Sequence, residues 1–248
     1  MNILGIDIGG TGIKGAIVDT KKGELKSERF RIDTPKPSTP DAVAGTILKI
    51  KNHFSWNNDI GCCFPSVVIN GNAKFSSNLD PKWKGVQIDA LFSKACDGLE
   101  FNIINDADAA GIAEMNFGVG KDKKGLGLMI TIGTGIGSGM FYDGQLIPNT
   151  ELGRIFGHDG DLFENYTADS ARKNENLEWH EWGKRFNKYL NHLVRIFSPD
   201  FFILGGGASK KMEKFENELN VDTPIYVSKN LNNAGIIGAA FNVIEPHH

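Results

Sequence analysis

Cysteine is scarce in this chain, with only Cys62, Cys63 and Cys96 among 248 residues. An adjacent pair followed by a distant third fits neither a disulfide framework nor a zinc-ligand set, so we expect reduced structural thiols. No apolar run approaches the roughly 18 residues that span a bilayer, and no segment has the layout of a signal peptide. The protein is therefore expected in the cytoplasm, without a membrane partner.

A strong excess of charge of one sign is also missing. The 27 basic and 30 acidic side chains leave a formal charge of −3 at pH 7, which argues against a broad nucleic-acid surface. Hydrophobic residues make up 40% and charged residues 23%, as in ordinary globular proteins, and the length allows two lobes. The terminal pair His247 and His248 is more typical of a tag than of a metal site.

Glycine, by contrast, is abundant, and it concentrates in two hairpins. In the first, Leu4, Ile6 and Ile8 alternate with smaller or polar residues as in a strand, and a second strand is expected from Ile13. Glycine has no β-carbon, so backbone N–H groups in the turn can approach a phosphate closely. The candidate phosphate-binding residues of this hairpin are Gly9, Gly10, Thr11, Gly12 and Lys14, with Asp7 beside them.

Two familiar glycine motifs do not explain this hairpin. Residues 10–15 satisfy the G-x-G-x-x-G spacing of dinucleotide-binding folds, but that fingerprint requires a helix to open at its last glycine. Here an apolar strand follows Gly15 and runs to a turn at Lys22 and Gly23, which leaves no room for a helix. The P-loop pattern is absent. An ordinary hairpin, with glycines only for the turn, remains the alternative.

A second glycine hairpin repeats this layout about half a chain later. Residues 128–132 and 136–142 predict two strands around Gly133, Thr134 and Gly135. Two such hairpins suggest a duplicated lobe, and each would offer N–H groups to one phosphoryl chain. We expect one lobe from residues 1–106 plus 234–246 and the other from residues 107–233.

The remaining segments alternate between strands and helices. Asp41 and Ser209 are the expected caps of two helices, and the segment 64–84 is either a meander with polar turns or a loop that grips a hydroxyl-rich ligand. Further strands are expected at 24–32, 60–64, 101–104 and 201–204, and helices at 42–54, 177–197 and 233–240.

Two polar sites follow buried strands. Asn105 and Asp106 come directly after the strand 101–104, where α/β folds place ligands, although a helix N-cap would also explain the aspartate. Gly206, Gly207 and Lys210 follow the strand 201–204. A lysine at the start of a helix opposes the helix dipole, so either a nearby phosphate or plain solvent exposure accounts for Lys210.

The order of these parts resembles the actin-like ATPase and sugar kinase superfamily, and in detail the polyphosphate glucokinase branch of the ROK family. The motifs that carry the resemblance are Asp7-Ile-Gly-Gly-Thr-Gly-Ile-Lys14-Gly, Thr34-Pro-x-Pro-x-Thr-Pro40, Phe64-Pro65, Asn78-x-Asp80-x-x-Trp83, Asn105-Asp-Ala-Asp-Ala-Ala-Gly111, Pro148-Asn-Thr-Glu151-Leu-Gly and Gly205-Gly-Gly207-x-Ser-Lys-Lys211.

The resemblance implies an α/β protein of two ribonuclease H-like lobes, with mixed sheets flanked by helices and a cleft between the lobes. It also implies phosphoryl transfer from polyphosphate, and also from ATP, to the 6-hydroxyl of glucose, with Asp106 as the general base. Mg²⁺ would be held near Asp7 through water, and no zinc is expected. The implied sugar-binding residues are Pro65, Ser66, Asn78, Asp80, Asn105, Asp106, Glu151 and Arg154.

The chain departs from this branch after Glu151. The branch usually reads Glu-Leu-Gly-His followed by a second Glu, whereas Arg154 and Phe156 stand here. Two alternatives to a glucose kinase therefore stay open, namely a kinase for another sugar and a sugar-binding or regulatory protein without turnover. ROK repressors carry an amino-terminal DNA-binding motif, but this chain starts at its first strand. A homodimer is a family expectation.

Overall fold

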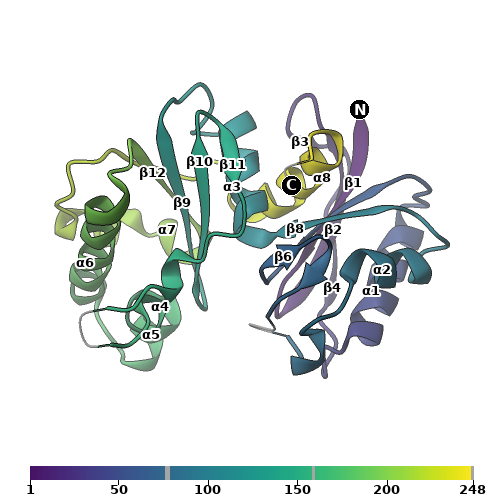
Figure 1. Ribbon diagram of the computed structural model, residues 1–248, viewed down its shortest axis with the longest axis horizontal. Helices are drawn as coiled ribbons and strands as arrows, with labels where there is room; N and C mark the ends of the chain where they lie inside the picture. Colours follow the sequence, from purple (N-terminus) through teal and green to yellow (C-terminus); the bar gives the residue numbers. More distant parts are fainter. Residues whose placement is uncertain (76–78, 158–159, 247–248) are drawn as a thin grey trace. The chain divides into compact units, whose positions relative to one another are not determined.

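The computed structural model describes residues 1–75, 79–157 and 160–246, which form two compact units (Figure 1). Unit 1 comprises Met1–Ala113 and Asn233–His248, and unit 2 comprises Glu114–Asn232. The first boundary therefore falls inside helix α3 (Asp106–Phe117) rather than at its first residue, where the sequence placed it. Within the described residues, no helix combines the length and apolar character needed to cross a bilayer.

Unit 1 is built on a six-stranded mixed sheet. Its order is β3-β2-β1-β5-β8, with β4 also paired to β2. The β1–β2 hairpin is antiparallel, whereas β1, β5 and β8 run parallel. The bounds are β1 Asn2–Ile8, β2 Gly12–Asp19, β3 Glu24–Leu25, β4 Phe30–Asp33, β5 Ile60–Phe64 and β8 Phe101–Asn105.

The strand expected at 24–32 is two short strands instead of one. Between β3 and β4, the N–H of Ile17 on β2 donates to Oγ of Ser27 (2.9 Å). A side-chain oxygen thus takes the place of a ladder carbonyl, and regular pairing with β2 resumes only at Phe30. Local hydrogen bonding by one serine therefore overrides the strand pattern.

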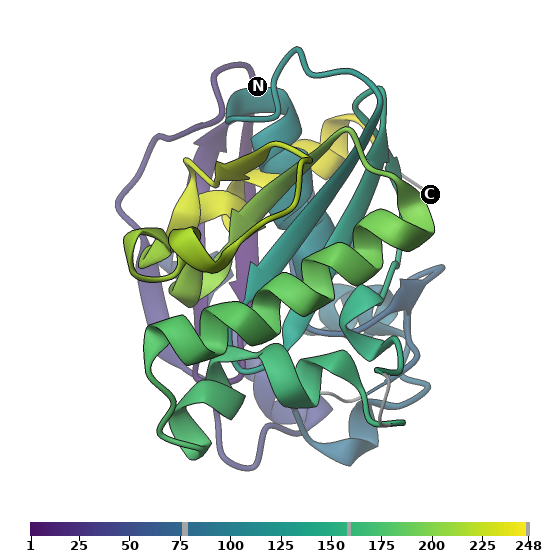
Figure 2. The same ribbon diagram turned by 90° about the vertical axis from the view of Figure 1, so that its left-hand side faces the viewer.

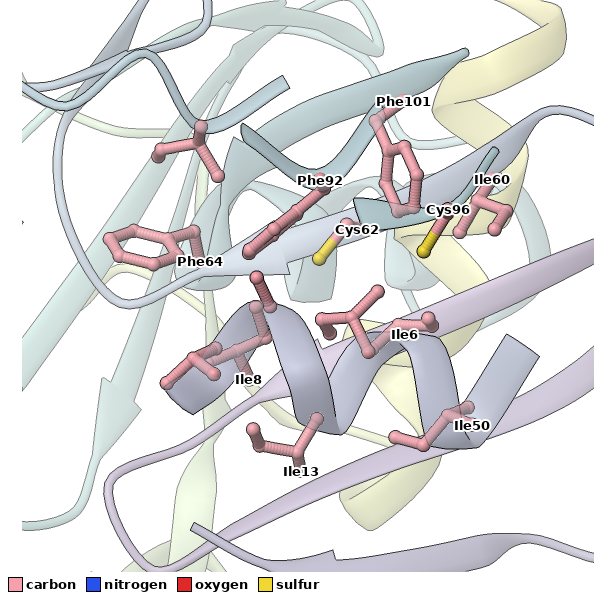
Figure 3. Packing of buried hydrophobic residues seen from close by; sticks show 14 of the residues in the cluster. Ile6, Ile8, Ile13, Ile50, Ile60, Cys62, Phe64, Phe92, Cys96 and Phe101 are labelled. Atoms are coloured by element: carbon pink, nitrogen blue, oxygen red, sulfur yellow. The ribbon is translucent and has the colours of Figure 1, made fainter. Parts of the chain in front are cut away.

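The two faces of this sheet are covered by different helices. Leu4, Ile6 and Ile8 face the core under α1 (Pro40–His53) and α2 (Ile88–Ala95), where Figure 3 shows Ile6 close to Ile50 of α1 and Ile8 close to its cross-strand partner Ile13. Helix α8 (Ala234–Ile244) covers the opposite face. A β-carbon at Gly61 would overlap the carbonyl of Ala239, so glycine in the strand lets α8 pack backbone to backbone. The tight packing expected of this small-residue helix is confirmed.

The structure decides two open points in unit 1, the cap of helix α1 and the form of the segment after β5. Helix α1 begins after Thr39, whose Oγ1 accepts from the N–H of Ala42 (3.4 Å), so the expectation that Asp41 is the cap was wrong. The segment after β5 is a meander of β6 (Val68–Ile69), β7 (Asn72–Ala73) and the 3₁₀ turn η1 (Pro81–Trp83). Trp83 is fully buried, so its indole belongs to the core and not to a ligand site.

Unit 2 contains a five-stranded mixed sheet in the order β11-β10-β9-β12-β13. Helix α6 (Trp179–Phe197) lies across one face, as Figure 2 shows, and its buried side chains from Trp182 to Leu193 pack on Leu128 and Phe202. The other bounds are β9 Leu126–Ile132, β10 Ile136–Tyr142, β11 Gln145–Ile147, β12 Phe201–Gly205, β13 Ile225–Val227, η2 Leu152–Arg154, α4 Phe163–Thr167, α5 Asp169–Asn174, α7 Gly206–Ser209, η3 Met212–Lys214, η4 Glu216–Glu218 and η5 Leu231–Asn233.

The two sheets share one pattern. In unit 1 the antiparallel hairpin β1–β2 is followed by the parallel strand β5, and in unit 2 the antiparallel hairpin β9–β10 is followed by the parallel strand β12. In both units a short glycine-containing turn joins the hairpin strands. The duplicated lobe inferred from the two hairpins therefore has a counterpart in the strand pairing.

Candidate active site

The tip of the β1–β2 hairpin is held in one conformation by its own unit. The N–H of Gly9 donates to the carbonyl of Gly12 (3.1 Å), and the hydroxyl of Thr34 donates to the carbonyl of Gly9. Nη2 of Arg31 donates to the carbonyl of Thr11 (3.0 Å). Carbonyl oxygens of the tip accept all three bonds. The bonds therefore hold the tip by the groups that would repel an anion.

Asp7 and Lys14 form an ion pair beside this tip. They are cross-strand partners, and Nζ of Lys14 lies 3.1 Å from Oδ2 of Asp7, with the two side chains only 26% and 19% exposed. The Cys63 thiol donates to the other carboxylate oxygen of Asp7, Oδ1 (3.5 Å). Burial, reinforced by the charge of Asp7, raises the pKa of Cys63 well above 9.0, so it stays a neutral donor.

Asp106 begins helix α3 at the carboxyl end of β8. Its Oδ1 accepts from the N–H of Ala107 (2.9 Å), and the residue is half-buried. The helix is capped mainly by Asn105, whose Oδ1 accepts from the N–H groups of Ala107 (2.8 Å) and Asp108 (3.1 Å). Because Asn105 performs the capping, the carboxylate of Asp106 is not needed as the helix cap.

The expected sugar residues of unit 1 already have structural partners. The hydroxyl of Ser66 donates to the carbonyl of Phe75 (2.9 Å), and Nδ2 of Asn105 donates to the carbonyl of Ser66 (3.1 Å). Asp80 caps η1 by accepting from the N–H of Lys82 (2.9 Å). Pro65 is buried. Asn78 lies outside the described residues, and a sugar-binding role for these residues stays a prediction.

The tip of the β9–β10 hairpin meets a carboxylate. The N–H of Gly133 donates to the carbonyl of Gly135 (3.0 Å), and the hydroxyl of Ser170 donates to the carbonyl of Thr134 (2.6 Å). On the other side of the tip, Oε2 of Glu164 accepts from the N–H of Ile136 (3.4 Å). A phosphate at this hairpin would therefore have to bind on the side of Gly133 and Thr134, away from the negative charge.

Glu151 is positioned by the strand next to it. The Ser138 hydroxyl on β10 donates to the carbonyl of Thr150 (2.7 Å) and accepts from the N–H of Leu152 (2.8 Å), which fixes the backbone on both sides of Glu151. Burial raises the pKa of Glu151; the positive charge of Arg154 opposes this rise, while the negative charge of Glu164 adds to it. The Arg154 side chain is exposed.

Of the two glycines after β12, Gly206 is required by packing. Gly206 has a φ of +80°, and a β-carbon there would overlap the carbonyl of Ile132, so glycine is required. Helix α7 begins at Gly206 and ends at Ser209, so the expectation that Ser209 caps a following helix was wrong. Lys210 follows that helix, and its Nζ donates to Oδ1 of Asn232 (2.8 Å). Gly207 is exposed.

Four residues at these hairpins were missed by the sequence analysis, namely Arg31, Thr34, Glu164 and Ser170. Each reaches a hairpin from another element, between 20 and 36 positions away along the chain. Arg31 carries a local signal, because it alternates with Arg29 and Asp33 along a short extended stretch, and Thr34 opens a motif of the family resemblance that does not point to this contact. For the other three no spacing rule would have identified the contact.

Asp7 is a candidate metal position. In the residues with described positions, no cluster of three or more His, Cys, Asp or Glu side chains could hold a metal ion. Mg²⁺, however, is commonly bound by one or two carboxylates with water and substrate phosphates completing its shell. The 19% exposed carboxylate of Asp7, beside the glycine tip, fits that kind of binding.

Residues 3–159 match the sequence profile of the ROK family. Polyphosphate glucokinase of Mycobacterium tuberculosis (strain CDC 1551 / Oshkosh) is 41% identical over 237 residues, which cover 96% of this chain and 89% of that protein.

Solved structures of sugar kinases are also similar to this chain. Inorganic polyphosphate/ATP-glucomannokinase from Arthrobacter sp. strain KM has a TM-score of 0.94 at 42% identity, and the match covers 99% of both chains. A ROK family glucokinase from Streptomyces griseus, solved with glucose and AMPPNP, has a TM-score of 0.82 at 20% identity over 97% of this chain and 98% of that chain. At 20% identity, the similarity to the Streptomyces griseus protein shows a shared fold only.

Proposed function

Because this chain belongs to the ROK family, we propose that it transfers a phosphoryl group from inorganic polyphosphate, and also from ATP, to the 6-hydroxyl of glucose. The observation that carries this proposal is the 41% identity to a polyphosphate glucokinase over 96% of the chain. The geometry of unit 1 supports it, because Asp7 and Lys14 form an ion pair beside the first glycine tip and Asp106 stands at the start of α3.

Asp106 is the general base of this reaction. Its carboxylate accepts the proton of the sugar hydroxyl as the oxygen attacks the terminal phosphorus of the donor, and a positioned base typically contributes ~10² to 10⁴ in rate. The cap formed by Asn105 and the short bond from Ala107 hold the carboxylate at the start of α3. Asp106 is half-buried, so part of the residue is accessible to a substrate.

Lys14 and the first glycine tip bind the donor. Phosphoryl transfer depends mainly on positioning and on neutralising the charge of the moving group. The ammonium of Lys14 and the N–H groups of the tip supply positive potential, and the bonds from Arg31 and Thr34 keep the carbonyl oxygens of the tip engaged. Gly133 and Thr134 would serve the donor in unit 2, on the side of their hairpin away from Glu164.

Mg²⁺ is the metal that the family implies, and Asp7 is the residue that would hold it. When bound, the ion would neutralise phosphate charge and orient the donor. Asp7 is paired with Lys14, so a carboxylate and an ammonium both stand beside the glycine tip. Glu151 and Glu164 are carboxylates suited to accept hydrogen bonds from sugar hydroxyls, and Arg154 is suited to donate them.

The test is glucose 6-phosphate formation by the purified protein, with inorganic polyphosphate and ATP supplied in parallel. We expect product with both donors and none from 6-deoxyglucose, which lacks the accepting hydroxyl. Mannose belongs in the same assay, because the solved structure at a TM-score of 0.94 is a glucomannokinase. Absence of product with every donor, together with measurable glucose binding, would favour the sugar-binding protein instead.

A further inference from the structure

Three charged side chains lie in a row on one face of the unit 1 sheet. Asp7 on β1 is the cross-strand partner of Lys14 on β2, and Lys14 is the cross-strand partner of Arg31 on β4. Directly opposite residues of neighbouring antiparallel strands project from the same face. Neighbouring strands are about 4.8 Å apart, so the backbone of Arg31 lies roughly 10 Å from that of Asp7.

The guanidinium of Arg31 is placed at the glycine tip. A β-carbon at Gly12 would lie only 2.5 Å from Nε and 2.7 Å from Nη2 of Arg31, so the guanidinium occupies the space above this glycine. Nη2 donates to the carbonyl of Thr11, and Nη1 lies 2.7 Å from Oδ1 of Asp33. The side chain is 47% exposed, and within the described residues these two contacts use two of its five N–H donors.

We propose that Arg31, together with Lys14, forms a subsite for a phosphate of inorganic polyphosphate beyond the phosphoryl group that is transferred. This inference rests on the proposed function and names a donor-binding residue outside the glycine motif. The row of charges begins at Asp7, where the reacting end of the donor is expected, and leads across two strands to Arg31. A phosphate chain laid along the row meets Lys14 first and Arg31 next.

The anions that now pair with these cations do not prevent such binding. The Asp33 side chain is 82% exposed, and an exposed ion pair contributes little because water and salt screen it. A chain that carries a negative charge on every phosphate can therefore replace Asp33 as the partner of Arg31. A bidentate contact to phosphate oxygens suits the planar guanidinium, which already has one fixed bond to the tip.

The position of Arg31 favours polyphosphate over ATP. ATP carries three phosphates and then a neutral ribose, whereas the charge of polyphosphate continues along the chain. A cation roughly 10 Å from Asp7 therefore gains more from polyphosphate. If Arg31 were only a brace for the hairpin tip, its removal would disturb the use of both donors equally.

The experiment compares Arg31→Gln and Asp33→Asn with the matched control Lys22→Gln. Lys22 is an exposed lysine in the turn after β2, so its substitution removes the same charge from the same unit. Thermal unfolding of each variant comes first. The primary readout is the Kd for long-chain inorganic polyphosphate without glucose, measured by calorimetry at low and at moderate salt. KM values for polyphosphate and for ATP follow.

We expect Arg31→Gln to weaken polyphosphate binding roughly tenfold, equivalent to about 1.4 kcal/mol. The dependence of its Kd on salt should become shallower. Its KM for ATP should rise by a clearly smaller factor, because ATP loses only the support that Arg31 gives to the Thr11 carbonyl at the tip. Asp33→Asn should tighten polyphosphate binding because it removes a competing anion, and Lys22→Gln should bind like the unmodified protein.

Several outcomes would overturn the subsite. They are unchanged polyphosphate binding in Arg31→Gln, an equal loss for ATP, a loss in Lys22→Gln of the same size, or no polyphosphate binding by the unmodified protein. Failure of the proposed function has a different signature, because polyphosphate would then bind in an Arg31-dependent manner while no glucose 6-phosphate forms. If Arg31→Gln unfolds early, the Asp33→Asn result, with its opposite sign, decides the question.

Discussion

Replacement of Asp106 by asparagine tests the proposed proton transfer separately from the hydrogen bond that this residue makes at the start of α3. Asparagine keeps a side-chain oxygen that can accept from the N–H of Ala107, as Oδ1 of Asp106 does at 2.9 Å. It loses the capacity to take a proton from the sugar hydroxyl. The Asn105 cap, with bonds of 2.8 Å and 3.1 Å to the start of α3, is untouched.

The two expected effects differ greatly in size. Loss of a general base reduces turnover by ~10² to 10⁴, or about 2.7 to 5.4 kcal/mol of activation free energy. The local hydrogen bond is worth at most about 1.5 kcal/mol in folding, and most of it survives in the variant, so we expect less than about 1 kcal/mol of destabilisation. For a chain of this length that corresponds to a few degrees in Tm at most.

The assay measures glucose 6-phosphate formation at saturating glucose and donor, with thermal unfolding and glucose affinity recorded on the same preparation. Asp89→Asn is the matched control. Asp89 also stands in the first turn of a helix, α2, and its Oδ1 likewise accepts from the next N–H, that of Ala90 (2.7 Å). We expect Asp106→Asn to lose turnover with unchanged glucose binding, and Asp89→Asn to retain turnover.

Two results would refute the reasoning. Turnover within a few-fold of the unmodified protein would remove Asp106 from the proton transfer. A comparable loss of turnover in Asp89→Asn would show that any aspartate in a first helical turn matters, and that the effect is structural.

Three further predictions concern unit 2. Burial raises the pKa of Glu151, so the folded state binds a proton there more tightly than the unfolded state does. The free energy of unfolding therefore falls as pH rises from the pKa of the unfolded state through the pKa of the folded state. Glu151→Gln should be more stable than the unmodified protein at neutral pH and lose this advantage in acid, which unfolding followed against pH would measure. Arg154→His should lower the KM for glucose about tenfold with kcat little changed, because a neutral imidazole can also accept a hydrogen bond, and an unchanged KM would mean that Arg154 belongs to a differently built site. Tyr189 is fully buried, and its hydroxyl has no hydrogen-bond partner within the described residues, so Tyr189→Phe should leave the free energy of unfolding unchanged or raise it by about 1 kcal/mol, whereas a loss on denaturant titration would reveal a hidden partner.

Elements with a long local pattern were predictable from the sequence. The alternation of Leu4, Ile6 and Ile8 is that of β1, and it separates the face under α1 from the face under α8. The aromatic spacing from Trp182 to Phe186 and Tyr189 is that of the buried side of α6. Such patterns depend on neighbours in the chain, because burial of one face imposes its period on the sequence.

Short or competing signals were misleading. Strand propensity predicted one strand at 24–32, but the bond from Ile17 to Ser27 divides it. Asp41 and Thr39 are both acceptable N-caps, and Thr39 caps the helix because Pro40 follows it in the first helical position. The first error came from a hydrogen bond with a neighbouring strand, and the second from a local signal, the proline after Thr39, that had not been weighed.

The positions of the glycine turns and strand ends could be predicted from the sequence, and with them the candidates Asp7, Lys14 and Asp106. The side chains that contact these residues depend on how the chain folds. The pairing of β2 with β4 brings Arg31 over Gly12, and α4 brings Glu164 to the second hairpin, 28 residues from its partner Ile136. Strand register and helix docking are set by the packing of whole faces, and a one-residue shift would turn each side chain the other way. No spacing rule within a single motif carries that information.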